Sequence, residues 1–239
     1  MTIYQRMRIG SAAIALLLAT GATAQAQNFE VGADLNFLTL AQSEGQATGY
    51  GFNLAPEIWA NYQTAGGLDI GMRWFWLDAT TPDGGSVYER VAMQTIDLTV
   101  GKPFEIGNGI SASLMGGLRY ATYTEYRTPA NFLDVPQAYG LMAGVEVNAS
   151  LSEAFSIYGK GSNAIMYAPE YADGGFPEYD LGFNISEVEL GVQFDRPMAN
   201  GGAFYLRLAG IGKMWNGVSD DDSENMSAFG ASLDMGISF

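Results

Sequence analysis

The segment Ala228–Phe239, AFGASLDMGISF, alternates apolar with small or polar side chains up to its last residue. Every second position from Phe229 onward is apolar, and Gly, Ser and Asp lie between them. Successive side chains of a β-strand point to opposite faces, so a period of two predicts a strand with one apolar face. Terminal residues of most domains make few contacts. This pattern instead predicts that the segment is part of the fold.

The N-terminal residues have the pattern of a secretory signal peptide. Two arginines precede an apolar stretch at 9–19, and an Ala-Gln-Ala motif ends at Ala26. A basic start, a short apolar stretch and a small-residue site are the parts of a cleaved signal. A transmembrane anchor is the alternative, but the stretch is too short to cross about 30 Å of hydrocarbon. We expect residues 1–26 to be the signal peptide and residues 27–239 to be the mature barrel domain.

Composition excludes several classes of function. The chain has a formal net charge of −15 and contains neither His nor Cys. Nucleic acids are bound through basic surfaces, so we expect no nucleic-acid partner. The absence of Cys removes disulfides and thiolate metal sites, and the absence of His removes the usual proton shuttle of a hydrolase. The acidic stretches at 169–180 and 217–225 lack the ligand spacing of a calcium loop. We therefore predict no enzyme, no cofactor and no metal.

Two sets of residues could still support catalysis. A serine nucleophile would need Lys160 or Lys213 as its base, which is an uncommon arrangement. Glu187 and Glu189 would lie about 7 Å apart on one strand face, a separation that suits paired acid and base work. We favour the simpler interpretation, in which Arg and Lys from adjacent strands neutralise these carboxylates.

Alternating segments recur along residues 27–239, and no apolar run there has the length of a membrane-spanning helix. A chain that enters a membrane without such helices does so as a closed barrel. We predict an all-β fold, an antiparallel transmembrane up-and-down β-barrel of ten strands, with eight and twelve strands left open. A soluble β-sandwich is the alternative. The ten segments lie near residues 29–37, 50–62, 68–76, 88–100, 110–120, 139–148, 155–166, 187–195, 204–214 and 228–239.

Short and long connections between these segments alternate. Outer-membrane barrels have short turns on the periplasmic side and longer loops outside, so the alternation favours that class. The short connections are 63–67, 103–109, 151–154 and 196–202, and the longer ones are 41–48, 79–87, 124–137, 167–182 and 216–226.

Aromatic residues gather near the expected strand ends. In outer-membrane barrels such residues form girdles at the two membrane interfaces. The residues that we assign to the girdles are Phe29, Tyr62, Trp74, Trp76, Tyr120, Tyr139, Trp215 and Phe239.

Charged residues share the face opposite to the apolar one, so we expect them inside the barrel. A ten-stranded barrel is only slightly wider than one that side chains fill, and any channel should be narrow. The surplus of carboxylates predicts a preference for cations, although Arg-carboxylate pairs could plug the lumen. The predicted pore-lining residues are Arg73, Arg119, Lys160, Arg207, Lys213, Glu57, Asp69, Asp97, Glu146, Glu187, Glu189 and Asp234, and Glu30 and Asp34 share their face.

Three stretches resemble a known family of pore-forming outer-membrane proteins, typified by the Legionella major outer-membrane protein and including planctomycete members. They are TIDLTVGKPFEIGNGISASLMGGLRYATY (95–123), AYGLMAGVEVNASLSEAFSIYGKGSNAIMYA (138–168) and EVELGVQFDRPMANGGAFYLRLAGIGKMWNG (187–217). The resemblance implies an outer-membrane barrel that passes small solutes. The type member contains Cys and this chain does not, so intersubunit disulfides do not carry over.

The expected function is a porin-like channel in the bacterial outer membrane, for passive diffusion of small solutes or ions through a narrow, charged lumen. The alternative is a closed structural or adhesive barrel with acidic surface loops. Expected partners are outer-membrane lipid, lipopolysaccharide and small solutes, and a homo-oligomer stays open. We also expect the barrel-assembly machinery to recognise the C-terminal residues Phe239, Ile237, Met235 and Leu233.

Overall fold

The computed structural model describes residues 29–42, 51–80, 90–128, 131–173, 176–199, 201–218 and 225–239. The predicted signal peptide lies outside these residues. Within them, ten strands follow one another: β1 (Phe29–Gln42), β2 (Asn53–Gln63), β3 (Asp69–Thr80), β4 (Arg90–Gly107), β5 (Ile110–Thr128), β6 (Asn131–Ser150), β7 (Phe155–Asp173), β8 (Phe176–Pro197), β9 (Ala203–Asn216) and β10 (Met226–Ser238).

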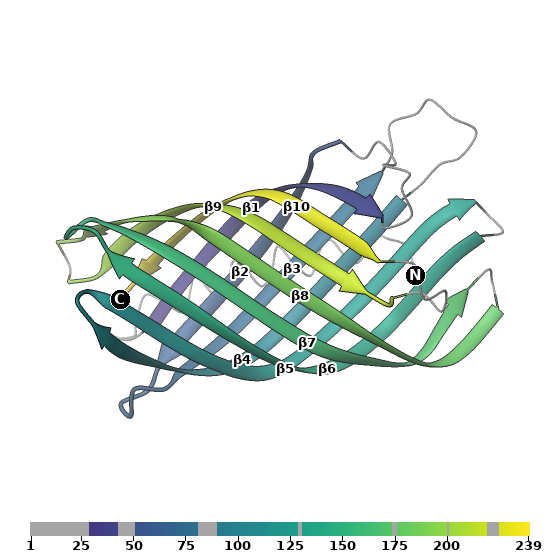
Figure 1. The fold of residues 1–239 in the computed structure, drawn as a ribbon, viewed down its shortest axis with the longest axis horizontal. Coiled ribbons are helices and arrows are strands. Elements are labelled where there is room, and N and C mark those ends of the chain that lie inside the picture. Colours follow the sequence, from purple (N-terminus) through teal and green to yellow (C-terminus); the bar gives the residue numbers. More distant parts are fainter. Residues whose placement is uncertain are drawn as a thin grey trace.

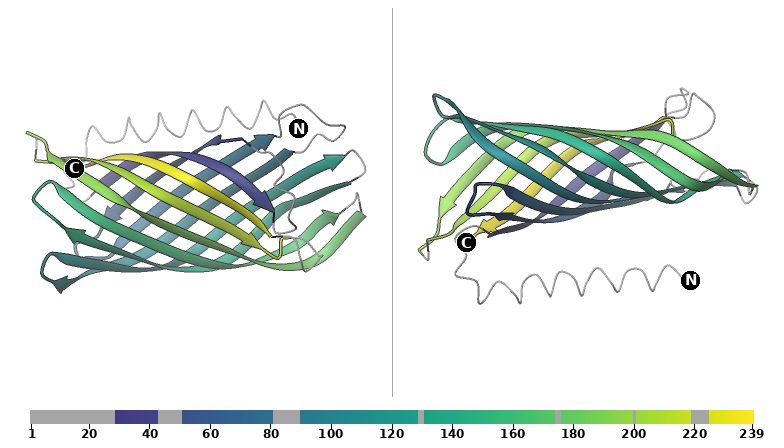
Figure 2. Two further views of the ribbon diagram at one scale, coloured as in Figure 1. Left: turned by 45° about the horizontal axis from the view of Figure 1, so that its top comes forward. Right: turned by 90° about the horizontal axis from the view of Figure 1, so that it is seen from below.

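The described strands close into one antiparallel barrel. Each strand is hydrogen-bonded to its neighbours in the chain, and β10 pairs with β1 to complete the wall. Figure 1 shows the strands running obliquely around the barrel, and Figure 2 shows the same wall from two further directions. None of the described residues forms a helix with the length and hydropathy that a membrane crossing requires. The predicted all-β barrel of ten antiparallel strands is confirmed.

The first and last strands pair along their whole length. Their register runs from Glu30 opposite Ser238 to Gln42 opposite Met226. The amide of Phe239 then donates a hydrogen bond to the carbonyl oxygen of Phe29, with an N···O distance of 2.9 Å. A free strand edge in hydrocarbon would leave backbone groups without hydrogen bonds. The pairing of β1 with β10 removes that edge.

The outward face of the wall is apolar. Leu141 on β6, Ile165 on β7 and Leu190 on β8 expose 71%, 73% and 66% of their surface. The exposed apolar patches of soluble monomers seldom exceed a few hundred Å². An outward apolar band combined with an inward polar face is the arrangement of outer-membrane barrels.

The two ends of the barrel differ in their connections. At one end, which we call the turn end, Asn108 and Gly109 join β4 to β5 with φ angles of 56° and 74°. Positive φ at both central residues fits the type I′ hairpin turn, whose twist matches that of the strands. The other end, which we call the loop end, carries the β5–β6 and β7–β8 hairpins (Figure 1).

Two of the predicted long loops are instead strands. In all their described residues, the stretches 124–137 and 167–182 belong to β5, β6, β7 and β8, which lengthen the two loop-end hairpins. The register of β5 with β6 shifts between Ala121 and Tyr123. A bulge exchanges inward and outward positions, so the period of two breaks in the sequence although the strand continues. The prediction of a loop at 124–137 was wrong because it depended on an unbroken period. The prediction at 167–182 was wrong because β7 stays paired with β8 as far as Asp173 opposite Phe176, although this stretch is polar.

Apolar side chains fill the loop-end half of the interior. Phe75, Tyr123 and Trp215 are each only 1% exposed. Protein interiors pack as densely as organic crystals, with few voids larger than a water molecule. We call this cluster the apolar core, and its members include Leu38, Leu40, Phe75, Leu77, Val91, Met93, Tyr123, Leu133, Val135, Met142, Met166, Tyr171, Leu181, Phe183, Ile185, Trp215 and Met226.

Trp215 belongs to the apolar core and not to an aromatic girdle. Its ring centroid lies 5.7 Å from that of Tyr123 and 5.9 Å from that of Phe183. Lys213 on the same strand is buried in the interior, and a side chain two residues further along a strand points to the same side. The girdle assignment of Trp215 was wrong for this reason. Tyr62 and Tyr139 do lie exposed on the outer surface.

Gly230 leaves room for the backbone where β10 pairs with β1. A Cβ atom on Gly230 would lie 1.9 Å from the carbonyl oxygen of Phe37, whereas a Cβ atom on Gly210 would meet nothing within 4 Å. We expect Gly230→Ala to reduce the fraction of protein that refolds in detergent, because the closing strands would have to separate. Gly210→Ala is the matched control. Gel migration without heating measures the folded fraction, and equal fractions for the two variants would contradict this expectation.

Candidate functional site

Between the apolar core and the turn end, the interior is polar and has two zones. The zone next to the apolar core is a layer of buried charged side chains, which we call the ion-pair layer. The second zone is a cavity nearer the turn end, which we call the turn-end chamber. The ion-pair layer consists of Glu57, Arg73, Asp97, Arg119, Glu187 and Lys213.

Asp97 and Arg119 form a two-point ion pair within this layer. They lie directly opposite each other on β4 and β5. Nε and Nη2 of Arg119 donate hydrogen bonds to the two carboxylate oxygens of Asp97, each at 2.7 Å. Nη1 of Arg119 lies 2.8 Å from Glu187, as an ion pair without hydrogen-bond geometry. Because the Arg119 side chain is fully buried, its charge depends on these carboxylates.

The ion-pair layer also connects opposite walls of the barrel. Lys213 on β9 lies 3.2 Å from Glu57 on β2 and 3.4 Å from Glu187 on β8. Arg73 on β3 lies 3.3 Å from Glu57 and 3.6 Å from Glu187. Since β3 and β8 stand far apart in the strand order, these contacts cross the lumen. Three cations face three carboxylates, so the layer is formally neutral.

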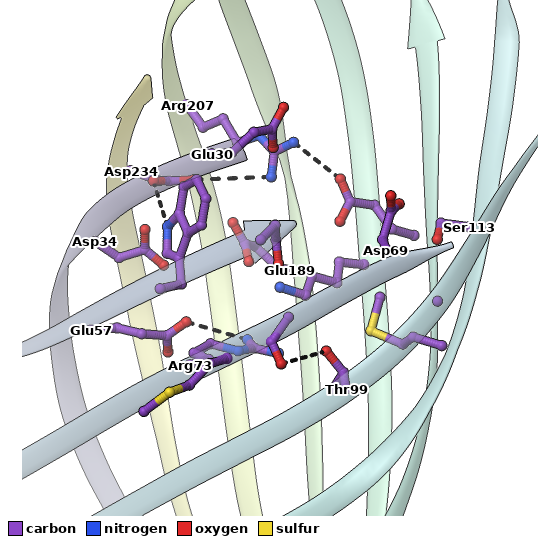
Figure 3. A pocket seen from close by; sticks show the side chains of 18 of the residues that line it. Glu30, Asp34, Glu57, Asp69, Arg73, Thr99, Ser113, Glu189, Arg207 and Asp234 are labelled. Atoms are coloured by element: carbon purple, nitrogen blue, oxygen red, sulfur yellow. Dashed lines mark hydrogen bonds and ion pairs between the residues drawn. The ribbon is translucent and has the colours of Figure 1, made fainter. Parts of the chain in front are cut away.

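The turn-end chamber has a volume of about 240 Å³. Solvent reaches its charged side chains, because Glu146 is 23% and Arg207 is 19% exposed. Figure 3 shows acidic side chains from several strands around this space, together with Arg73 and Arg207. The charged residues that line the chamber are the carboxylates Glu30, Asp34, Glu57, Asp69, Glu146, Glu189 and Asp234 and the cations Arg73, Lys160 and Arg207.

Arg207 is fixed by polar and aromatic contacts on one side of the chamber. Its Nε donates to Gln193 at 2.6 Å, and its Nη2 donates to Glu146 at 3.1 Å. The guanidinium carbon lies 4.6 Å from the ring centroid of Tyr158, within cation–π range. The Tyr158 hydroxyl in turn donates to Glu189. Arg207 is therefore a positioned group and not a mobile counter-ion.

Buried polar atoms without a partner lie along the seam of β1 and β10. Asp34 faces Asp234 and Asn36 faces Ser232 across this seam. Asp34 is 8%, Asn36 0% and Ser232 2% exposed. Within the described part of the chain, no hydrogen-bond partner exists for Oδ1 of Asp34, for either polar side-chain atom of Asn36 or for Oγ of Ser232. Buried polar atoms in proteins rarely stay without hydrogen bonds, and of these three residues only Asp34 also lines the turn-end chamber.

All twelve predicted pore-lining residues lie in the barrel interior. Six form the ion-pair layer, and the other six line the turn-end chamber: Asp69, Glu146, Lys160, Glu189, Arg207 and Asp234. Their role in lining a pore stays a prediction, because the apolar core fills the interior beyond them. Sequence reasoning missed Asn36 and Ser232, which are uncharged, although each shares a strand face with a predicted interior aspartate.

The four residues of the predicted assembly signal lie at the end of the closing strand. Leu233, Met235 and Ile237 occupy the outward positions of β10, since Asp234 between them lies inside. Phe239 follows the strand and hydrogen-bonds to Phe29. Recognition of these residues by an assembly machinery stays a prediction.

The residues that could have supported catalysis are engaged in other contacts. Lys213 is ion-paired to two carboxylates. Glu187 belongs to the ion-pair layer, whereas Glu189 accepts a hydrogen bond from Tyr158 in the chamber. Among the described residues, no three acidic side chains converge as metal ligands.

No protein-family model and no curated protein sequence matches the chain, so the family resemblance drawn from the sequence stays a prediction. Solved structures of other barrels do match. The outer-membrane protease OmpT from Escherichia coli is 9% identical with a TM-score of 0.49, covering 90% of this chain and 97% of its own. The β domain of the Bordetella autotransporter BrkA is 12% identical with a TM-score of 0.46, over 89% and 98%. A major outer-membrane protein from Thermus thermophilus is 14% identical with a TM-score of 0.43, over 89% and 99%.

Proposed function

We propose that this protein is an outer-membrane barrel whose interior is closed to solutes, and that it supports its loop-end hairpins at the cell surface. The apolar core is the observation that carries this proposal. A water-filled path would have to pass side chains such as Phe75 and Trp215, which are 1% exposed and packed in the lumen. Opening that path would require the core to unpack.

The outer surface supports a place in a membrane. Its apolar side chains would be in contact with water in a soluble protein, whereas acyl chains would cover them in a bilayer. The twelve predicted pore-lining residues lie inside and not on this apolar surface, and six of them form the formally neutral ion-pair layer. The predicted signal peptide agrees with export to this membrane.

The loop-end hairpins support a role in surface contacts. Glu170, Glu178 and Asp180 are exposed there, beside the aromatic residues Phe176 and Tyr179. Exposed aromatic side chains next to charged groups are common in interfaces between proteins. These hairpins correspond to the acidic surface region of the alternative drawn from the sequence.

A narrow channel is the second candidate, and the turn-end chamber favours it. The chamber provides a charged vestibule that solvent enters from one side. A channel would need a second state in which the apolar core moves aside. In the state described here, the chamber ends at the ion-pair layer.

Solute flux into proteoliposomes tests the closed barrel. We expect liposomes that contain the refolded protein to swell in a small sugar or amino acid no faster than protein-free liposomes, because the apolar core excludes water. A general porin reconstituted in parallel shows that the assay detects flux. Swelling that rises with the amount of this protein would contradict the proposal and favour the channel.

A further inference from the structure

The charges of the turn-end chamber are out of balance. Seven carboxylates and three cations line it. Arg73 and Arg207 already pair with Glu57, Glu146 and Asp234. Within the described chain, no cationic side chain lies within ion-pair distance of the remaining four carboxylates, which are Glu30, Asp34, Asp69 and Glu189.

Lys160 is the chamber's only cation without an ion pair in the described residues. It lies between Glu146 on β6 and Glu189 on β8 in the strand register. Its ammonium group forms no ion pair within 4 Å in the described chain, although acidic side chains surround it. One ammonium group cannot neutralise four carboxylates, so the chamber keeps a surplus of negative charge that solvent can reach.

Among the four carboxylates without an ion pair, Asp34 is the one with an unsatisfied buried oxygen atom. It lines the chamber and is 8% exposed, yet its Oδ1 has no hydrogen-bond donor in the described protein. Burying a carboxylate oxygen without a donor is unfavourable. A bound donor at this point would satisfy it. Trp59 already donates to Asp234 across the seam, so that carboxylate is better satisfied.

We propose that the turn-end chamber binds small organic cations, with Asp34 as the anchor for a primary ammonium group. An ammonium group provides three donors and one positive charge, which is what the unpaired oxygen and the acidic surplus require. A diamine would carry a second ammonium group for another of the carboxylates that line the chamber. A metal ion fits less well, because no three acidic side chains converge in the described residues. The chamber volume of about 240 Å³ accommodates a chain of a few carbon atoms.

Calorimetric titration of the refolded full barrel in detergent tests this site with 1,4-diaminobutane as the probe. We expect saturable binding, weaker binding of n-butylamine and none of 1,4-butanediol, which has the same length without charge. Asp34→Asn should weaken diamine binding about tenfold or more, because a charge-assisted hydrogen bond is lost. Lys160→Gln should strengthen it, because a competing ammonium group is removed.

Glu105→Gln is the matched control, since Glu105 is an exposed acid near the β4–β5 turn outside the chamber. Unheated gel migration shows that each variant is folded, and Asp69→Asn replaces Asp34→Asn should the latter fail to fold. Absence of saturable diamine binding would overturn the proposal, as would equal affinity in the wild type and the Asp34 variant. Displacement of the diamine by equimolar Mg²⁺ would also overturn it in favour of a metal site. Diamine binding tests the cation site, and solute flux tests the closed barrel. Either proposal can therefore be refuted while the other stands.

Discussion

Replacing Asp97 by Ala is expected to lower the free energy of unfolding by about 3–5 kcal/mol. Arg119 is fully buried and donates two hydrogen bonds to Asp97, at 2.7 Å each. The substitution leaves a guanidinium charge inside the barrel with Glu187 as its remaining carboxylate. Urea unfolding in detergent micelles, followed by tryptophan fluorescence, measures the change.

Two further variants separate the buried charge from a general loss of contacts. Asp78→Ala removes a partner of Arg90 in a pair whose carboxylate is 49% exposed, and we expect a loss of less than about 1 kcal/mol. The double variant Asp97→Leu with Arg119→Leu removes both charges and should be more stable than Asp97→Ala. If Asp97→Ala and Asp78→Ala lost the same free energy of unfolding, burial would not explain the contribution of the Asp97–Arg119 pair.

Trp215→Ala is expected to lower the free energy of unfolding by about 3–5 kcal/mol, because it leaves a cavity in the apolar core. Trp215 stacks on Phe183 at an interplanar angle of 14° and is 1% exposed. Trp215→Phe keeps an aromatic ring and should lose less. The same unfolding experiment, followed by far-UV circular dichroism, measures both variants.

Leu141→Ala is the matched control for the apolar core. Leu141 is 71% exposed on the outward face, where detergent or lipid fills the space that a shorter side chain leaves. We expect a small loss of stability for this variant. A loss as large as that of Trp215→Ala would mean that the interior packs no better than the outer surface.

Much of the fold follows from the sequence because a strand inside a closed barrel repeats every two residues. The closing strand is an example, since Asp234 and Ser232 lie inside and Met235 and Leu233 lie outside. The apolar core was harder to predict, because alternation assigns a side chain to a face without showing what it packs against. On β3, the period of two that puts Arg73 inside also puts Phe75 and Leu77 inside, but it does not show that they join apolar side chains of other strands in one cluster.

The candidate site follows from the sequence only in part. Alternation assigns a side chain to a face, and all twelve charged residues that it assigned to the interior lie there. It cannot assign partners across the lumen, because Arg73 and Glu187 lie on strands that are distant in the sequence. The separation of a neutral ion-pair layer from an acidic chamber depends on these partners. The sequence therefore predicted a charged lumen but not the apolar core in its loop-end half.

Single-channel recording in planar bilayers tests the closed interior most directly. We predict that wild-type protein, inserted in a folded state, gives no current above that of bare lipid, because a hydrophobic constriction excludes water and ions. Stable ohmic steps from the wild-type protein would contradict the closed barrel.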